Sequence, residues 1–232
     1  MKKTAGLILC IMLFFQAFLA GADSSWNTAV RHYRVSEDLK PHSMKVLSQT
    51  FNGKMDLEKT EELIFHLSYD VKGQTISELI QATEDGKDVT EQRKNENRNQ
   101  RGRGGSPTGN SEGFEKNPLD PAVQSDLTAA DTGTTEDKDG ERCAVWEFRL
   151  KLNNNHDAVG KTWISLKTGA AVSLEYSIEP NFPFVEEMSI GMNYKVDSMG
   201  RWLMKEMRFK GRVNMIIMKK NFDAITSFSD YW

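Results

Sequence analysis

The side chains that could do chemistry are few and widely spaced. The four histidines have no partner at a helical or strand spacing that suits a metal ion; they are His32, His42, His66 and His156. The sequence contains no Gly-x-Ser-x-Gly elbow, phosphate-binding loop or His-Glu-x-x-His motif. Carboxylates are plentiful on polar faces, where solvation is a simpler role than paired acid and base chemistry. We therefore expect no catalytic residue, no metal and no cofactor, and we do not expect an enzyme.

Cysteine offers little more. Cys10 lies in an N-terminal apolar run, which leaves Cys143 without a partner for an internal disulfide. Cys143 could be a reactive thiol, but a cysteine at the start of an apolar strand is more often a small core residue. We expect Cys143 in the core.

Soft apolar side chains are the more unusual feature. Seven methionines fall within one stretch of 31 residues: Met188, Met192, Met199, Met204, Met207, Met215 and Met218. Methionine is flexible and polarizable, so it suits a surface that receives varied apolar partners. The same residues could equally fill an irregular core, and the sequence leaves both interpretations open.

Alternating apolar and polar residues predict the elements that carry these side chains. From Cys143 to Trp232 hydrophobic residues recur at every second position, as in half-buried strands. Turn signals separate the runs, including Lys210-Gly211 and Lys219–Asn221, and predict a meander of about six antiparallel strands. Val213–Met218 is apolar at nearly every position, so we expect a strand covered on both faces.

Adjacent strands of a meander share a face, so their apolar phases should meet. We expect one hydrophobic ligand cavity lined by Trp146, Phe148, Leu150, Val172, Leu174, Tyr176, Met188, Ile190, Met192 and Tyr194.

The N-terminal half also predicts strands. Met44–Phe51 turns at Asn52-Gly53, a dipeptide that favours tight hairpins, and Leu63–Val71 is followed by Gln74–Ala82. Ser24–Leu39 fits a helix or an extended strand, and we expect a helix. Val89–Asn99 follows a capping arrangement and should be helical.

The first residues resemble a secretory signal of bacterial type. Lys2 and Lys3 precede an apolar run from Leu7 to Leu19, and Ala20-Gly21-Ala22 ends it. We expect cleavage after Ala22 and export to the periplasm; the alternative is an uncleaved membrane anchor.

Residues 97–142 are rich in polar and small side chains. Such a segment buries too little surface to offset the entropy of ordering, so we expect a mobile insert within a single domain of residues 23–232. Within it, Pro121–Leu127 should form a short helix with Asp120 as its cap. The early Arg-Gly stretch resembles an RNA-binding tail, but a solvated linker is simpler. The net charge of −3 gives no warrant for a nucleic-acid partner.

Several C-terminal motifs resemble the LolA/LolB-like outer-membrane lipoprotein-sorting superfamily. They are Gly160–Ser165, Lys167–Gly169, Val172–Leu174, Gly200–Trp202 and Phe228–Tyr231, and Asp85–Thr90 is similar to a strand-to-helix junction of such proteins. The resemblance implies an incomplete, strongly curved barrel, helices covering its mouth and a cavity for acyl chains in the periplasm. The insert departs from that pattern, which leaves Val89–Asn99 and Pro121–Leu127 as the candidate lid.

An outer-membrane barrel is a different class that such strands could form. Its strands keep one face apolar through the bilayer, where a midplane cation costs about 2–4 kcal/mol. Arg201–Phe209 carries Lys205 in one phase and Arg208 in the other, so we favour a protein that is not integral to the membrane.

Together these patterns predict a mainly β protein. Its fold should be a curved antiparallel sheet of nine or ten strands, or incomplete β-barrel, with one to three short helices covering the mouth. The predicted function is a periplasmic carrier for lipoprotein acyl chains or lipid, with a possible envelope membrane protein as partner. The alternative is a non-transport envelope interaction or stress-sensing module of the same fold.

Overall fold

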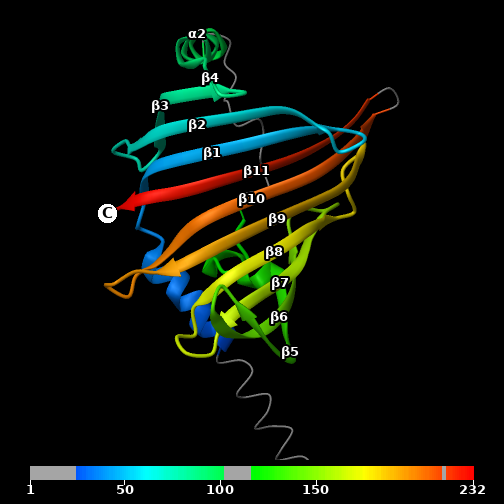
Figure 1. Ribbon diagram of the computed structural model, residues 1–232. Coiled ribbons are helices and arrows are strands. Elements are labelled where there is room, and N and C mark those ends of the chain that lie inside the picture. Colours follow the sequence, from blue (N-terminus) through cyan, green and yellow to red (C-terminus); the bar gives the residue numbers. More distant parts are fainter. Residues whose placement is uncertain (1–24, 102–115, 216–217) are drawn as a thin grey trace, which may run out of the picture.

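One curved antiparallel sheet dominates the structure (Figure 1). The structure is a computed structural model that describes residues 25–101, 116–215 and 218–232; the predicted signal peptide lies outside these residues. The strands are β1 (Pro41–Asn52), β2 (Leu57–Tyr69), β3 (Thr75–Glu84), β4 (Lys87–Asp88), β5 (Leu127–Lys138), β6 (Glu141–Lys151), β7 (Asp157–Ser165), β8 (Ala171–Glu179), β9 (Val185–Val196), β10 (Trp202–Met215) and β11 (Met218–Tyr231). The mainly β, curved-sheet prediction is confirmed, with eleven strands in place of nine or ten.

The strand order joins the two halves of the chain in the middle of the sheet. It runs β4-β3-β2-β1-β11-β10-β9-β8-β7-β6-β5, so every neighbour is consecutive in sequence except the pair β1 and β11. Those two strands pair over almost their whole length, from Pro41 opposite Tyr231 to Asn52 opposite Lys220. The two edges, β4 and β5, are therefore neighbours along the chain.

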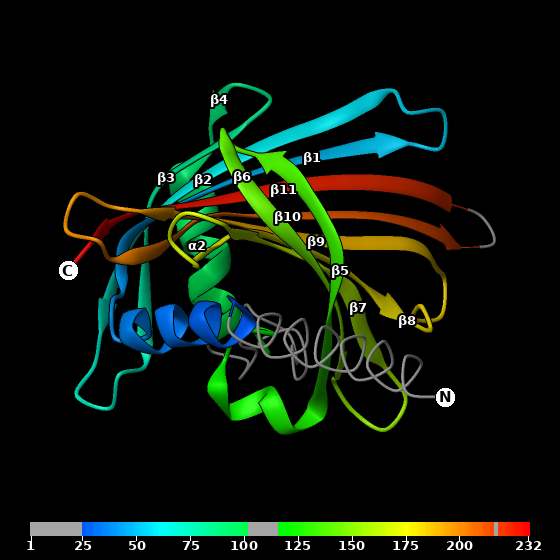
Figure 2. The same cartoon turned by 90° about the horizontal axis from the view of Figure 1, so that it is seen from below.

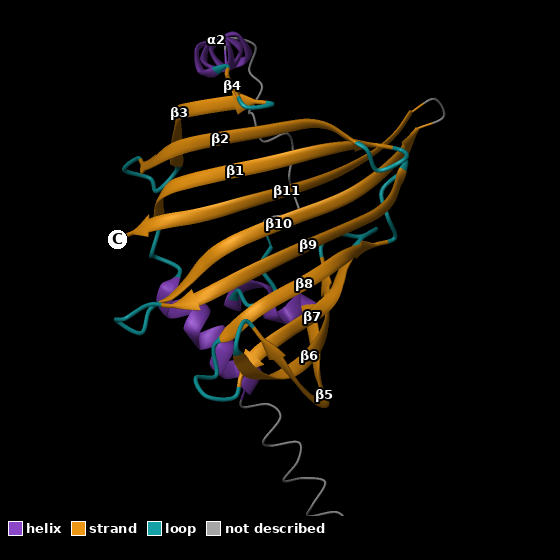
Figure 3. Cartoon of the chain, viewed as in Figure 1, coloured by secondary structure: helices purple, strands orange, loops and turns teal. Residues whose placement is uncertain are grey.

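The described residues form three helices: two lie on the concave side of the sheet, and the third lies at its β4 edge (Figures 2 and 3). The first spans residues 25–36 and confirms the helix expected there; it is called the N-terminal helix below. α2 (Thr90–Arg101) confirms the predicted helix after β4, and η1 (Pro121–Asp126) is a 3₁₀ helix. The Asp120 carboxylate accepts a hydrogen bond from the Ala122 N–H, and Pro121 takes the first turn, as the sequence predicts.

The hairpin of β10 and β11 corrects two expectations. Lys210-Gly211 and Lys219–Asn221 are not turns but lie inside strands of 14 residues each. Strand alternation continues through Gly211, because Arg208, Lys210 and Arg212 keep to one face while Phe209 and Val213 keep to the other. Val213–Met218 is not one covered strand, since Met215 pairs with Met218 across the two strands.

The expected mobile insert is too long. Residues 116–142 form η1, β5 and the start of β6, and residues 97–101 complete α2; residues 102–115 lie outside the described part. β5 is polar because it is an edge strand with exposed side chains, and its backbone pairs with β6. Composition alone does not distinguish such a strand from a linker.

Candidate functional site

The concave face has a packed half, formed by β6 to β9. Nine of the ten residues predicted to line a cavity belong to one buried cluster there, each no more than 5% exposed: Trp146, Phe148, Leu150, Leu174, Tyr176, Met188, Ile190, Met192 and Tyr194. These nine side chains, expected from the sequence to lie together, do so in the structure. That they line a ligand cavity stays a prediction.

Val172 is the exception, because it lies in a separate cluster with Cys143, Val145 and Trp163. A bulge explains the error. Trp163 pairs with Ser173 and Ile164 with Ala171, so Val172 is an extra residue in β8. One extra residue reverses the alternation of a strand. Val172 consequently lies apart from Leu174 and Tyr176, whose phase it shares in the sequence.

The N-terminal helix covers the packed half. The ring of Trp26 lies 5.7 Å from that of Trp146 and 6.4 Å from that of Phe148, between centroids. Further along, Tyr33 lies 5.9 Å from Trp202, and Ala29 between them is fully buried. Aromatic contacts thus fix the helix along its length.

A satisfied polar network lies inside this apolar cluster. The Asn117 amide donates to the hydroxyl of Tyr194 at 2.9 Å, and that hydroxyl donates to the sulfur of Met192 at 3.3 Å. Burial raises the pKa of Tyr194 and raises the pKa of Tyr176 to about 12. Both phenols are therefore neutral at physiological pH.

The other half of the concave face is a strip of partly exposed apolar residues, called here the concave strip. It lies on β1, β2, β10 and β11 and consists of Met44, Val46, Leu63, Phe65, Met207, Phe209, Phe222 and Phe228. Met207 and Phe209 also pack against the buried cluster, so the two halves form one continuous apolar surface.

Strand register places these residues on one face. Phe209 stacks on Phe222 with ring centroids 5.3 Å apart and an interplanar angle of 15°. Phe228 lies opposite Met44, and Met44 lies opposite Phe65. Directly opposed residues of antiparallel strands point to the same side. The strip therefore faces the same space as the N-terminal helix (Figure 2).

Charge, rather than apolar contact, attaches α2 at the far border of the strip. Arg93 pairs with Glu61 of β2, with Glu84 of β3 at 2.8 Å and with Glu96 of α2 at 2.8 Å. The hydrogen bond to Glu96, together with the charges of Glu61 and Glu84, raises the pKa of Arg93. α2 lies beyond β3 in Figure 1, and the strip lies between α2 and the N-terminal helix.

The sequence carried a signal for this strip. Leu63, Phe65 and Leu67 alternate in β2, and Phe222, Ala224, Thr226 and Phe228 alternate in β11. What it lacked was the pairing of β1 with β11, which brings the two ends of the chain onto one surface. We expected the site in the C-terminal meander alone.

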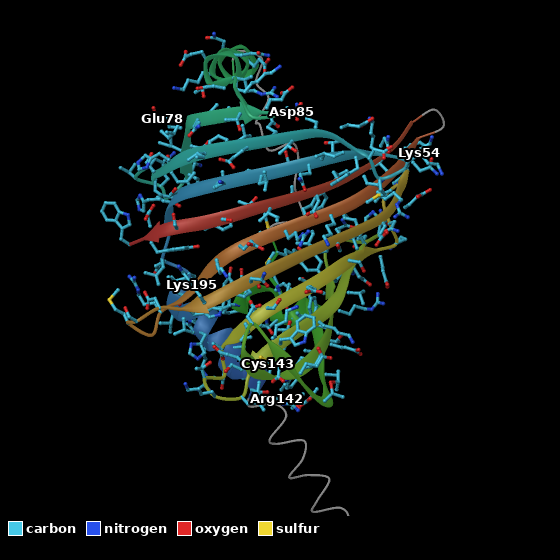
Figure 4. The ribbon with its side chains drawn as sticks, viewed as in Figure 1. Lys54, Glu78, Asp85, Arg142, Cys143 and Lys195 are labelled. Atoms are coloured by element: carbon cyan, nitrogen blue, oxygen red, sulfur yellow. The ribbon has the colours of Figure 1, made fainter. Side chains whose placement is uncertain are left out.

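Other candidate groups remain separate. Cys143 is buried at the start of β6, beside Arg142 (Figure 4), and burial raises the pKa of its thiol. Among the described residues no three His, Cys, Asp or Glu side chains gather as a metal site would require. None of the helices in the described ranges has both the length and the apolar character needed to cross a bilayer.

Comparison with known proteins gives likenesses of fold. No family model and no curated protein matches the chain. Solved structures that match include a DUF1329 family protein from Desulfovibrio piger, at 10% identity and a TM-score of 0.41, with 90% of this chain and 92% of that chain covered. A LolA superfamily protein from Nitrosomonas europaea matches at 11% identity and a TM-score of 0.37, with 90% and 92% covered. A putative outer membrane lipoprotein-sorting protein domain from Vibrio parahaemolyticus matches at 12% identity and a TM-score of 0.38, with 89% and 92% covered.

The sequence resembles LolA-like proteins, and two structures described in those terms are among the matches. The similarity concerns the fold, and the function proposed below is argued from this chain's own residues.

Proposed function

We propose that the concave face binds the acyl chains of a lipoprotein or lipid, and that the protein is a periplasmic carrier in outer-membrane lipoprotein sorting or envelope lipid trafficking. The observation that carries this proposal is the concave strip, an apolar surface that continues the packed core but lacks a cover among the described helices. A partly exposed apolar surface of this kind is typical of ligand grooves and interaction sites.

The shape and composition of the strip suit a flexible hydrocarbon. Aromatic rings such as Phe209 and Phe222 offer flat faces, and Met44 and Met207 adapt to the outline of their partner. The opposite face of β10 carries Glu206, Arg208, Lys210 and Arg212, so on this strand the concave side is the apolar one. Burying apolar area is favourable by about 25 cal/mol per Å².

Two neighbouring residues of β1 provide a matched test. Val46 faces the strip and Leu47 faces the other side, and both are partly exposed. Val46→Lys places a charge where the acyl chain would lie, and Leu47→Lys places the same charge on the opposite face. Displacement of a fluorescent fatty acid measures affinity, and thermal unfolding shows whether both variants fold.

We expect the parent protein and Leu47→Lys to bind alike. Val46→Lys should bind about tenfold more weakly, equivalent to about 1.4 kcal/mol, because an ammonium group must be desolvated against the chain. Equal affinities for the two variants would place binding elsewhere.

Native mass spectrometry of protein from an envelope fraction separates the two predicted functions. A carrier should co-purify with lipid, whereas an interaction or stress-sensing module should be empty and bind no acyl probe. A membrane-protein partner stays a prediction.

A further inference from the structure

Trp146 differs from the other buried tryptophans in its indole N–H. The indole of Trp26 donates to the Gln124 side chain at 3.0 Å, and that of Trp163 to the Glu136 carboxylate at 2.7 Å. Trp202 donates to the backbone carbonyl of Ala171 at 2.7 Å. Trp146 is only 4% exposed, yet its Nε1 has no hydrogen-bond partner among the described residues.

A second unpartnered atom lies directly across the strand pair. Thr162 of β7 is opposite Trp146 of β6, and the Thr162 side chain is fully buried with no partner for Oγ1. The described residues contain three buried side-chain atoms without a partner, the third being Nε of Arg93. Two of the three therefore belong to one cross-strand pair, and one member of that pair, Trp146, is a predicted site residue.

Such atoms are costly, since leaving a buried polar group unpaired destabilises a protein by about 1–3 kcal/mol. The same core satisfies Tyr194 with Asn117, so it does provide partners for buried polar groups. A pair of unused groups on one face is what a ligand with a hydrogen-bond acceptor would use.

The chemistry of these two groups restricts the kind of acceptor that the ligand can carry. An indole N–H can only donate, and a threonine hydroxyl can donate as well, so each can donate to an acceptor oxygen. A carboxylate is disfavoured, because the residues clustered around Trp146 are apolar. A neutral ester or amide carbonyl fits this environment.

The position of Trp146 near the edge of the sheet lets the polar head of such a ligand reach solvent. Trp146 lies one strand from the edge, opposite Asp131 of β5, where the register shifts between Asp131 and Thr135. The bulge leaves exposed polar residues at that edge, so a polar head group can leave there. In the other direction β10 lies four strand spacings away, about 19 Å, and the acyl chain can run toward the concave strip.

We propose that Trp146 Nε1 and Thr162 Oγ1 form a polar subsite for the ester or amide carbonyl at the head of an acyl chain. The proposal rests on the proposed function and adds selectivity for the carbonyl. The ring of Trp26 covers Trp146 in this structure, so the ligand displaces that contact when it binds.

Two ligands of equal chain length test it: lauroylglycerol, which carries an ester, and its ether analogue dodecylglycerol, which has no carbonyl. Full-length mature protein should bind the ester about fivefold more tightly, the effect of one net hydrogen bond. Thr162→Val keeps the side-chain shape and should bring the ratio of affinities close to one. Trp146→Phe should do the same, whereas Thr83→Val, the same exchange on the opposite face of β3, should keep the parent ratio.

The outcomes separate the two proposals. If neither ligand binds, the proposed function fails and the subsite with it. If both bind equally to the parent, the carrier function stands and the subsite is refuted, as when the two atoms hold only an ordered water. An unchanged ratio in Thr162→Val also refutes it. A preference for the ester that Thr162→Val removes supports the subsite, and competition by a diacylated lipopeptide or by phosphatidylglycerol then identifies which class of acyl ester binds better.

Discussion

The ring of Phe222 lies over Gly211, its partner across the β10–β11 ladder. A Cβ at Gly211 would come within 2.4 Å of two carbons of that ring. The absence of a side chain therefore lets the ring lie against the sheet, where it also stacks on Phe209. An aromatic residue opposite a glycine compensates for the missing side chain.

Gly211→Ala should consequently destabilise the protein by about 1–3 kcal/mol, because the ring has to move out of its stack. Phe222→Leu in the same chain should recover part of that loss. A double-mutant cycle of urea unfolding measures the coupling. Strictly additive effects would show that ring and glycine do not contact each other in solution.

Trp26→Ala should cost about 3–5 kcal/mol of the free energy of unfolding, since this buried indole packs on both Trp146 and Phe148. Val35→Ala is the matched control, because Val35 lies in the same helix and is 82% exposed. Chemical denaturation compares the two. Similar small losses would mean that the N-terminal helix is not part of the core.

Thr162→Val should leave the free energy of unfolding unchanged or raise it by up to about 1 kcal/mol, because the hydroxyl has no partner to lose. Thr83→Val is the control, because Thr83 lies on the face of β3 that points away from the concave side. It shows the effect of the Thr-to-Val exchange itself. A clear loss of stability on Thr162→Val alone would indicate a hydrogen bond that the structure lacks.

Cys143 should react with a maleimide only after unfolding. The residue is fully buried, and burial raises the pKa of its thiol, so little thiolate is present at neutral pH. Mass spectrometry with and without urea follows the labelling. Rapid modification of the native protein would contradict the packing around Val145 and Trp163.

Asp223 should contribute to acid sensitivity. Its carboxylate accepts a hydrogen bond from Nε of Arg208 at 2.9 Å, and this bond lowers the pKa of Asp223. A carboxyl with a lowered folded-state pKa stabilises the fold above its unfolded pKa of about 3.9 and loses that contribution as the pH falls through the folded value. The contribution should be about 1 kcal/mol or less, because the Arg208 side chain is 44% exposed. Asp223→Asn should flatten the pH dependence of unfolding below pH 5 by that amount.

Local patterns predicted the elements better than their pairing. Alternation identified the strands around Trp146 and Leu174, and the sequence Asp120-Pro121 identified a short helix. The phase of Val172 was wrong because a single inserted residue leaves no signal in composition. The pairing of β1 with β11 could not be predicted, because it depends on contacts between residues more than 160 positions apart, such as that of Asn221 with Asn52.

The same limit applies to the site. The packed residues were predictable because burial requires apolar side chains, but the covering helix and the concave strip depend on tertiary arrangement. The unpartnered atoms of Trp146 and Thr162 could not be predicted for a related reason. A sequence shows which side chains can form hydrogen bonds, but it does not show which of them lack a partner in the fold.

The pairing of β1 with β11 has a consequence for how the protein is made. During synthesis β1 emerges early. β11, the strand that lies between β1 and β10, emerges after the other strands of the sheet. Until then the β1–β4 and β5–β10 groups can form only as two separate ribbons with exposed edges. Contacts this distant in sequence slow folding. The sheet should therefore assemble only after β11 has emerged, and a nascent chain should stay unfolded long enough for a chaperone to hold it.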